Sequence, residues 1–383
     1  MRNNRLIALA QDNKPRYMIQ LDALRALAVF AVMLQHFVPD SSQGSILYFF
    51  KSILPWGKLG VSLFFVLSGF LITGILLRCR DTIDLAKQNN WFTIKRFYIR
   101  RLLRIFPIYY LTLAVTAIAN IPPVRETFFW HLTYTSNIYI ALTGDWNDGP
   151  ITHFWSLSVE EQFYLFWPFV ILLVPKNNLL AAILTTIIIG PLFRLACVGA
   201  GLNDTQIYVL TFSCLDLLGI GAILAFYSYK AAYFKQFKTE LCNFGFWVCG
   251  PLLLALQIMD RLNIGNVASI VIEPTVAAFF FMWLIDRAAQ GFGGVPGTIL
   301  ELSPLVYLGK LSYGIYVYHN FMNPIISDIL PNVFQHLGLP YPSSLTTQVF
   351  LKTVATLIVA VLSWHFIEKP INDFKKYFGY RKS

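Results

Sequence analysis

Long apolar runs separated by short polar segments recur along the whole chain. We interpret ten of them as membrane-spanning helices, since each is long enough to cross roughly 30 Å of hydrocarbon as an α-helix. The predicted spans are residues 21–40, 59–77, 102–120, 155–174, 179–198, 206–229, 241–259, 268–286, 304–329 and 347–367. Their apolar residues are continuous rather than alternating, which argues against a β-barrel. The pattern therefore predicts an all-α fold, a polytopic transmembrane helix bundle.

Composition supports the same class of protein. The chain has 383 residues, of which 56% are hydrophobic and only 13% are charged. A soluble domain of this size cannot bury so much apolar surface. We expect one membrane domain over residues 1–383, with a cytoplasmic N-terminal segment at 1–20 and a basic cytoplasmic tail at 368–383.

The positive charges are distributed unevenly between the two sides of the predicted bundle. With the N-terminus inside, ten crossings place 22 of the 30 Lys and Arg residues in inside segments and five in outside segments. The positive-inside rule then predicts that both termini are cytoplasmic. This distribution accounts for the net charge of +10 without a nucleic-acid partner.

The cysteines give no sign of a metal centre or a disulfide framework. There are five of them, none forms a CxxC pair, and they are scattered over apolar segments. An odd, dispersed set of this kind is typical of packing residues in a core. We therefore expect no bound metal. The cysteines are Cys79, Cys197, Cys214, Cys242 and Cys249.

The first predicted span carries two ionisable residues, Arg25 and His36. Eleven residues at about 100° each leave about 20° after three turns, so the two side chains share one helix face about 16 Å apart along the axis. Asp22 lies one turn before Arg25 and can pair with it. Arg25 alone can snorkel to lipid headgroups, and His36 alone can make a structural bond. Two such residues on one stripe indicate a polar path through the bundle, because charge in hydrocarbon is costly.

Two further blocks carry small or basic residues near the membrane. The stretch GVSLFFVLSGFLIT contains Ser68 and Gly69, which allow close approach of a ligand or of another helix. The stretch RFYIRRLLRIFPIYY places Arg101 and Arg104 three residues apart, on one side of a helix. Such a pair suits phosphate groups, although a basic patch that only sets topology is an equally simple interpretation.

Acidic residues and histidines occur in two later blocks. In THFWSLSVEEQFYLFWPF, Glu160 and Glu161 enter an aromatic helix, and His153 precedes Glu160 by almost two turns. A carboxylate there can orient a histidine or take part in proton transfer. In LGKLSYGIYVYHNF, Lys310 and His319 fall inside the ninth predicted span. A structural role for His319 and a role in a site are both compatible with its position.

Taken together, these blocks resemble the acyltransferase-3 family of integral-membrane acyltransferases. The resemblance runs from about Tyr17 to Pro370 and rests on five elements in the family's order. They are the Arg25–x10–His36 pair, FFVLSGFLI, the Arg101–x-x–Arg104 pair, WSLSVEEQFYLFWP and LSYGIYVYH.

The resemblance implies an enzyme, an acyl-CoA-dependent O-acyltransferase of the bacterial inner (plasma) membrane. It implies transfer of an acyl group, usually acetyl, from cytoplasmic acetyl-CoA to a hydroxyl of an extracytoplasmic carbohydrate. Acceptors in the family include lipopolysaccharide O-antigen, exopolysaccharide and peptidoglycan. Acetyl-CoA is then the donor substrate, and no tightly bound cofactor is expected. Some members carry a fused C-terminal hydrolase-like domain, which we expect to be absent here.

The resemblance also implies roles for the polar residues of the spans. We expect Arg25, Arg101 and Arg104 to hold the phosphates of the donor, and Ser68 and Gly69 to let its thin arm pass close to the backbone. The thioester would then reach the first span's histidine.

For the chemical step, we expect His36 to act as general base or to carry the acyl group briefly. Glu160 would orient or charge-balance a histidine, with His153 as a second partner. The residues expected to contact the carbohydrate acceptor are Glu161, Tyr164, Tyr316 and His319.

A transporter or flippase for a lipid-linked sugar is the main alternative, because it also needs buried charges along a path. A membrane di-iron oxidase is disfavoured, since none of the six histidines form closely spaced His-x2–4-His clusters. A sensor or purely structural membrane protein remains a third interpretation. The sequence predicts neither the acceptor sugar nor an oligomeric state.

Overall fold

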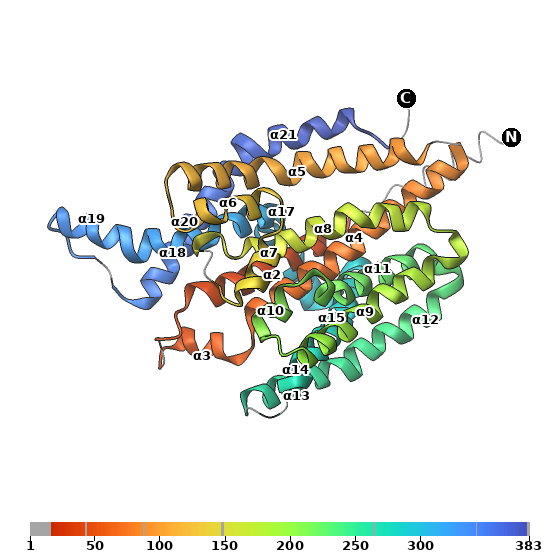
Figure 1. Cartoon of the computed structure of the whole chain (residues 1–383), viewed down its shortest axis with the longest axis horizontal. Helices are drawn as coiled ribbons and strands as arrows, with labels where there is room; N and C mark the ends of the chain where they lie inside the picture. Colours follow the sequence, from red (N-terminus) through yellow and green to blue (C-terminus); the bar gives the residue numbers. More distant parts are fainter. Residues whose placement is uncertain are drawn as a thin grey trace.

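The structure is a computed structural model that describes residues 17–42, 44–86, 89–146, 149–262, 264, 266–341 and 343–380. All regular secondary structure in these ranges is helical, which confirms the predicted all-α fold. The long helices lie side by side in a bundle (Figure 1). They are α2 (Ile19–Phe37), α4 (Trp56–Ala86), α5 (Asn90–Ile118), α8 (Phe154–Leu173), α9 (Leu179–Gly199), α11 (Leu215–Tyr229), α15 (Glu273–Gln290), α17 (Ser303–Tyr318) and α20 (Leu345–Ser363).

Shorter helices connect and cover these long ones. They are α3 (Ile46–Ile53), α6 (Val124–Leu132), α7 (Ser136–Thr143), α10 (Asp204–Val209), α12 (Ala231–Phe244), α13 (Gly250–Arg261), α14 (Asn266–Val271), α16 (Gly294–Leu300), α18 (Met322–Pro324), α19 (Leu330–His336) and α21 (Lys369–Asp373). Two short 3₁₀ turns matter for the sites described below. They are η3 (Thr211–Cys214) and η5 (His319–Phe321).

Seven helices in the described ranges are long and apolar enough to cross a membrane, and each coincides with a predicted span. Two of them continue without a break through a π-helical segment, so that α12 joins α13 and α20 joins α21. The seven are Ile19–Phe37, Trp56–Asp84, Asn90–Ile118, Lys176–Gly199, Thr211–Tyr229, Ala231–Arg261 and Leu345–Tyr377.

The other three predicted spans are helical but do not meet the same criteria. The span at 304–329 is interrupted, because α17 has only 16 residues before the chain turns into η5 at His319. The spans at 155–174 and 268–286 correspond to α8 and α15, which have 20 and 18 residues and carry acidic side chains inside the helix. The expected count of ten spans is thus supported for seven, and the three shorter or more polar helices contribute residues to the sites described below.

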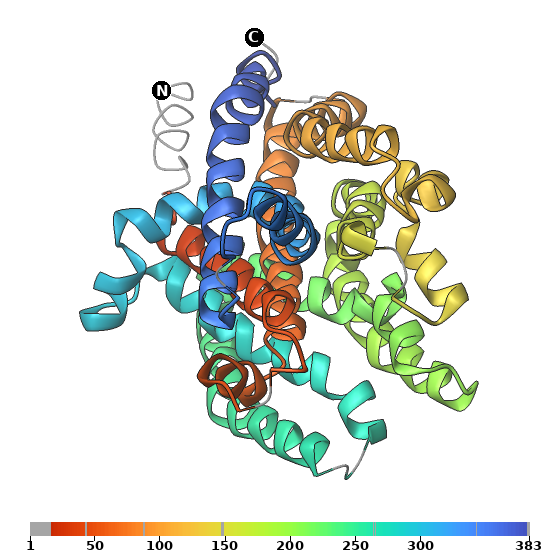
Figure 2. The ribbon, with the colours of Figure 1, turned by 90° about the vertical axis from the view of Figure 1, so that its left-hand side faces the viewer.

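Glycines allow the central helices to pack at backbone contact. A Cβ on Gly69 of α4 would lie 1.9 Å from the carbonyl oxygen of Leu218 in α11, and one on Gly221 of α11 would lie 2.0 Å from that of Val66. Only glycine tolerates such an approach, so these two residues fix the α4–α11 crossing. The early helices α2 and α4, red and orange, lie in the middle of the molecule (Figure 2).

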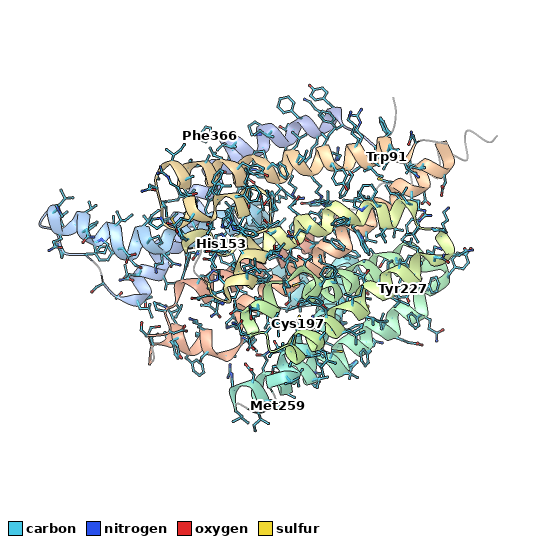
Figure 3. The ribbon with its side chains drawn as sticks, viewed as in Figure 1. Trp91, His153, Cys197, Tyr227, Met259 and Phe366 are labelled. Carbon is cyan, nitrogen blue, oxygen red and sulfur yellow. The ribbon has the colours of Figure 1, made fainter. Side chains whose placement is uncertain are left out.

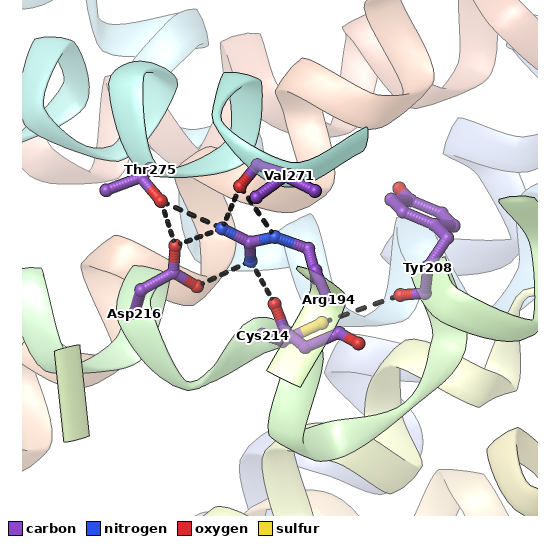
Figure 4. A network of polar contacts seen from close by, with 7 residues as sticks. Arg194, Tyr208, Cys214, Asp216, Val271 and Thr275 are labelled. Atoms are coloured by element: carbon purple, nitrogen blue, oxygen red, sulfur yellow. Dashed lines mark hydrogen bonds and ion pairs between the residues drawn. The ribbon is translucent and has the colours of Figure 1, made fainter. Parts of the chain in front are cut away.

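A buried ion pair ties α11 to three further helices. Arg194 of α9 donates two parallel hydrogen bonds to Asp216 of α11, at 2.9 and 2.7 Å, and both side chains are almost completely buried. The guanidinium also donates to the carbonyl oxygen of Val271 in α14 and to the hydroxyl of Thr275 in α15 (Figure 4). Thr275 in turn donates to Asp216. A charge inside the bundle is thereby fully hydrogen-bonded, as a low-dielectric interior requires.

The outer surface of the bundle is apolar. Ile118, Trp91 and Phe366 are 80%, 65% and 77% exposed, whereas His153 is 3% exposed. Figure 3 accordingly shows Trp91 and Phe366 at the periphery and His153 among the helices. An exposed apolar exterior around a polar interior is what a lipid environment requires. All five cysteines are buried free thiols, in agreement with their predicted packing role.

Candidate active site

A cavity of about 90 Å³ opens among α2, α4, α5, α8 and α17. Eight of the site residues predicted from the sequence line it, and they come from five separate helices. Val61, Phe64, Phe65, Leu71, Ile72, Ile105 and Leu157 give it an apolar wall. The polar and tyrosine residues that line it are Arg25, Ser68, Arg101, Arg104, Ser156, Glu160, Glu161, Tyr164, Ser312, Tyr313 and Tyr316. We call this space the first cavity.

Three guanidinium groups converge on the first cavity. Arg25 is held by Asp22 in the first turn of α2, with a nitrogen–oxygen distance of 2.9 Å, which confirms the predicted pair. Tyr17 donates a hydrogen bond to the same carboxylate. Arg101 and Arg104 both face the cavity from α5, as their spacing predicts. In the part of the chain that the structure describes, no ion pair joins either of these two to a carboxylate.

The three cations are therefore concentrated at one cavity, and only Arg25 is neutralised by an ion pair. Arg101 lies over the ring of Tyr164, 4.9 Å from its centroid, which orients the guanidinium without removing its charge. An arrangement of this kind is suited to a ligand that carries several negative charges, such as phosphate groups.

One face of α8 supplies the opposite wall. Ser156, Glu160 and Tyr164 follow one another at intervals of four residues, so all three point into the cavity. The hydroxyl of Ser68 donates to Glu160 at 2.5 Å, and Tyr164 donates to Ser68 at 2.9 Å. The expected contact between Glu160 and a histidine is not found. Glu160 instead joins α8 to α4 through Ser68.

The neighbouring carboxylate, Glu161, also lines the cavity. Its Oε1 atom is buried and has no hydrogen-bond partner in the structure. A buried carboxylate oxygen without a partner is energetically costly, so it is a position where a ligand hydroxyl or ammonium group would be accommodated.

A second polar group, a cluster of three histidines, lies beyond the cavity. His36 at the end of α2 and His319 at the end of α17 are joined by a hydrogen bond between Nδ1 and Nε2 at 2.7 Å. The two rings are parallel within 5° with centroids 5.0 Å apart, which is the geometry of an in-plane, edge-to-edge bond. His153 packs edge-on against His319, with ring centroids 4.6 Å apart.

The hydrogen bonds of this cluster determine which nitrogen of His36 is free. His319 Nδ1 lies 2.7 Å from the carbonyl oxygen of Tyr316, which can only accept, so this nitrogen carries a proton. In a neutral ring, His319 Nε2 is then an acceptor, and His36 Nδ1 must be the donor. The remaining nitrogen, His36 Nε2, keeps its lone pair. The side chain of His36 is exposed, whereas His319 is completely buried.

His153 is buried, and it is not hydrogen-bonded to Glu160 as the sequence analysis expected. Its Nε2 lies 3.3 Å from the carbonyl oxygen of Val317, and its Nδ1 has no hydrogen-bond partner. It therefore packs against the His36–His319 pair from the side and makes no hydrogen bond to either ring. His153 thus lies next to the histidine pair that contains the predicted base, His36, and a catalytic role for His153 stays a prediction.

Tyr316 separates the first cavity from the histidines. Its ring lines the cavity and lies 5.2 and 5.5 Å from the rings of His153 and His319. Its hydroxyl donates a hydrogen bond to the carbonyl oxygen of His153 at 3.0 Å and is also hydrogen-bonded to the hydroxyl of Ser156 at 2.5 Å. His36 does not line the cavity. The expected continuous polar path from Arg25 to His36 is thus interrupted, because Tyr316 is fixed across it.

Gly69 is also placed differently from the expectation. Its α-carbon faces Leu218 of α11, at backbone contact, and it does not line the cavity. The helix-packing interpretation of this glycine therefore applies, while its neighbour Ser68 does line the cavity. Of the two residues expected to contact the donor, Ser68 and Gly69, Ser68 alone lines the cavity.

Sequence reasoning missed several residues of the site. Ser156 and Ser312 were not singled out, although each precedes a predicted site residue by four positions, before Glu160 and Tyr316 respectively. Helical spacing from an already suspected residue is the signal that would have found them. Tyr313 lies three positions before Tyr316, which is the same kind of helical spacing, whereas Tyr17 carries no such signal.

The chain matches the family described as "Acyltransferase domain" over residues 18–365. It is 28% identical over 395 residues to the peptidoglycan O-acetyltransferase OatA of Listeria monocytogenes, covering 95% of this chain and 57% of that protein. It is 28% identical over 380 residues to the putative peptidoglycan O-acetyltransferase YrhL of Bacillus subtilis, covering 93% of this chain and 55% of that protein.

A putative O-acetyltransferase of Staphylococcus aureus strain MSSA476 is likewise 28% identical, over 96% of this chain and 59% of its own length. The chain thus spans less than 60% of the length of each of these relatives. No solved structure matches the chain. Because the family match covers nearly the whole sequence and includes every residue of the first cavity and of the histidine cluster, the chain belongs to the acyltransferase-3 family of integral-membrane acyltransferases.

Proposed function

We propose that this protein is a membrane O-acyltransferase that moves an acetyl group from cytoplasmic acetyl-CoA to a hydroxyl of an extracytoplasmic carbohydrate in the bacterial plasma membrane. The observation that carries the proposal is the position of three guanidinium groups on a cavity that ends one tyrosine away from a hydrogen-bonded histidine pair. Family membership and the printed names of the relatives support an acyl transfer reaction.

The donor would enter with its phosphates at Arg101 and Arg104. These cations have no carboxylate partner among the described residues, so they are available for charge-assisted hydrogen bonds to phosphate oxygens. Arg25 lines the same cavity and adds a third positive charge. The apolar wall of α4 would then accommodate the thin arm that bears the thioester, and movement of the Tyr316 side chain would admit the thioester to His36.

His36 Nε2 would act as general base. The acceptor hydroxyl oxygen attacks the thioester carbonyl carbon while the hydroxyl proton passes to Nε2. A bond forms between this oxygen and the acyl carbon, and the bond from the acyl carbon to the sulfur of coenzyme A breaks. The thiolate then takes the proton from the imidazolium, which restores the neutral ring. His319 holds His36 in the tautomer that this step needs, and it can delocalise the transient positive charge through their shared hydrogen bond. A route through an acyl-histidine would use the same nitrogen.

Peptidoglycan is the acceptor we propose first. The relatives from Listeria monocytogenes and Bacillus subtilis carry peptidoglycan in their printed names, whereas none of the three relatives described above is named for lipopolysaccharide. O-antigen and exopolysaccharide, which the sequence resemblance also suggested, gain no support from these names. Mass spectrometry of envelope glycans from cells with and without the gene would identify the acceptor by an acetyl-sized mass difference.

Loss of a single donor-binding cation gives the direct test. Arg104→Met in protein purified into lipid nanodiscs is expected to weaken acetyl-CoA binding by about 10- to 100-fold, the equivalent of one or two charge-assisted hydrogen bonds. Calorimetric titration with acetyl-CoA measures this directly. Arg96→Met is the matched control, since Arg96 lies on the same helix but contacts Phe92, Phe378 and the carbonyl oxygen of Tyr377 outside the cavity.

Equal affinities of wild type, Arg104→Met and Arg96→Met for acetyl-CoA would contradict the donor site. A wild-type protein that neither binds acetyl-CoA nor transfers acetyl to glycan, but moves lipid-linked sugar between leaflets, would establish the transporter alternative instead.

His319 is a positioning residue in this proposal. A conservative replacement distinguishes its hydrogen-bonding role from a role in packing alone. A glutamine amide can donate to Tyr316 through nitrogen and accept from His36 through oxygen, whereas leucine can do neither. We expect His319→Leu to lower kcat by about 10- to 100-fold, and His319→Gln to retain a substantial part of the rate. Both variants should bind acetyl-CoA like wild type. Equal rates for the two variants would show that His319 acts through its bulk alone.

A further inference from the structure

A larger cavity of about 280 Å³ lies on a different face of α4, among α9, α10, η3, α11, α13, α14 and α15. It lies toward the His36 end of α2, because Gly57 at the start of α4 contacts Gln35 and Lys58 lines the cavity. We call it the second cavity. The polar residues of its wall that matter here are Lys58, Asp204, Ser213, Asp260, Ser269 and Glu273.

The net charge of the second cavity is negative, whereas that of the first cavity is positive. Arg194 belongs to the wall but is neutralised by its bidentate pair with Asp216 (Figure 4). The remaining charged lining residues are three carboxylates, Asp204, Asp260 and Glu273, and one ammonium group, that of Lys58. The site therefore has an excess of negative charge and repels a phosphate-bearing donor. A neutral, polyhydroxylated ligand is compatible with it.

The second cavity also contains polar groups that lack a partner. Ser213 is a lining residue that is 3% exposed, and its Oγ atom is buried and makes no hydrogen bond in the structure. The Oγ of Ser269, another lining residue, is buried and unpartnered as well. Two orphan hydroxyls at the wall of a cavity indicate a ligand that supplies hydrogen-bonding groups of its own.

An aromatic surface leads from the cavity to the exposed side chain of Trp146. The ring of Tyr208 lies 4.8 Å from that of Trp155 and 6.2 Å from that of Trp146, and Trp146 is 41% exposed. Aromatic faces provide broad apolar contact next to a polar rim. Carboxylates, hydroxyls and aromatic rings together are the groups that bind the hydroxyl and C–H faces of a sugar ring.

We infer that the second cavity is a glycan subsite, which binds one sugar unit of the carbohydrate acceptor and so holds the neighbouring unit at the His36 end of the bundle. The inference rests on the proposed function and adds the place where the acceptor is recognised. Val61 and Phe65 line both cavities, so two apolar side chains separate the donor from this sugar unit. That wall keeps the two substrates apart until the reacting groups meet at the histidines.

Ser213→Ala distinguishes a ligand-binding hydroxyl from a structural one. Removing a buried hydroxyl that has no partner is expected to leave the Tm unchanged or to raise it. Binding of a neutral N-acetylglucosamine tetrasaccharide, followed by tryptophan fluorescence in nanodiscs, is expected to weaken by about tenfold, the equivalent of one lost hydrogen bond. Glu273→Gln, which keeps the shape of the site, should weaken the same binding to a similar extent. Glu240→Gln on the exposed face of α12 is the matched control.

Two outcomes overturn the glycan subsite. One is equal tetrasaccharide affinity in wild type, Ser213→Ala and Glu273→Gln. The other is competition between the tetrasaccharide and coenzyme A, which would place both ligands in one cavity. Because fluorescence reports binding without turnover, the subsite is tested even if the protein transfers no acetyl group. Conversely, acetyl transfer with an unaltered KM for glycan in both variants would refute the subsite and leave the proposed function intact.

Discussion

Replacing His36 by alanine is expected to lower acetyl transfer by about 10²- to 10⁴-fold, the range contributed by a positioned general base. The reason is the hydrogen-bond chain from the Tyr316 carbonyl through His319 to His36, which leaves Nε2 as the free basic nitrogen of an exposed side chain. The measurement is the rate of transfer from labelled acetyl-CoA to glycan fragments by protein in nanodiscs. Affinity for acetyl-CoA should be unchanged, since His36 does not line the first cavity.

His336→Ala is the control for the loss of an imidazole, because His336 is exposed and its ring is bonded to the carbonyl oxygen of Asn332 one turn earlier. It should transfer acetyl at the wild-type rate. Full activity of His36→Ala would refute the mechanism. A stable label on His36 in protein quenched during turnover would assign the acyl-histidine route rather than direct attack.

The arrangement of residues on the first span separates donor binding from the acyl-transfer step. Arg25 and His36 lie on one helix, yet only Arg25 reaches the first cavity, while His36 is bonded to another helix beyond Tyr316. Arginine variants should therefore alter donor affinity, and histidine variants should alter the rate at saturating donor. A structure in which a rearranged Tyr316 joins the two regions would be the catalytic conformation.

Helical spacing made the cation side of the site predictable. Arg101 and Arg104 share a face of α5 because they are three residues apart, and Asp22 reaches Arg25 for the same reason. Apolar length likewise predicted the seven long crossings, since the bilayer thickness sets a minimum for each helix. Relations within one helix are encoded by local periodicity and can be derived without a structure.

Relations between helices were not predictable in the same way. Glu160 is bonded to Ser68, 92 residues away, and His36 is bonded to His319, 283 residues away. A hydropathy pattern identifies helices but does not specify which of their faces meet, so the bond from Glu160 to Ser68 could not be predicted, and the expected contact with a histidine is not found. Gly69, which packs at the α4–α11 crossing, was visible in the sequence, but its partner, the backbone of Leu218, was not.

Arg194→Met is expected to lower the free energy of unfolding by about 3–5 kcal/mol, because it leaves Asp216 as an unpaired charge in the interior. Asp216 is completely buried, and its one other hydrogen bond to a side chain in the described part of the chain is accepted from Thr275. The change should appear as a lower Tm and as loss of monodisperse protein after mild heating in detergent. Lys176→Met breaks an ion pair whose side chains are 57% and 46% exposed, and should cost less than about 1 kcal/mol.

The double variant Arg194→Met/Asp216→Leu separates the value of the pair from the cost of breaking it. With both charges removed and similar volumes retained, no unpaired charge remains, and the double variant should recover most or all of the stability that Arg194→Met loses. A double variant as unstable as the single one would show instead that the hydrogen bonds to Val271 and Ser213 hold α9 in place. In either case the pair carries no free charge into the second cavity, so its polar wall can bind a sugar unit only through the carboxylates, hydroxyls and Lys58 around it.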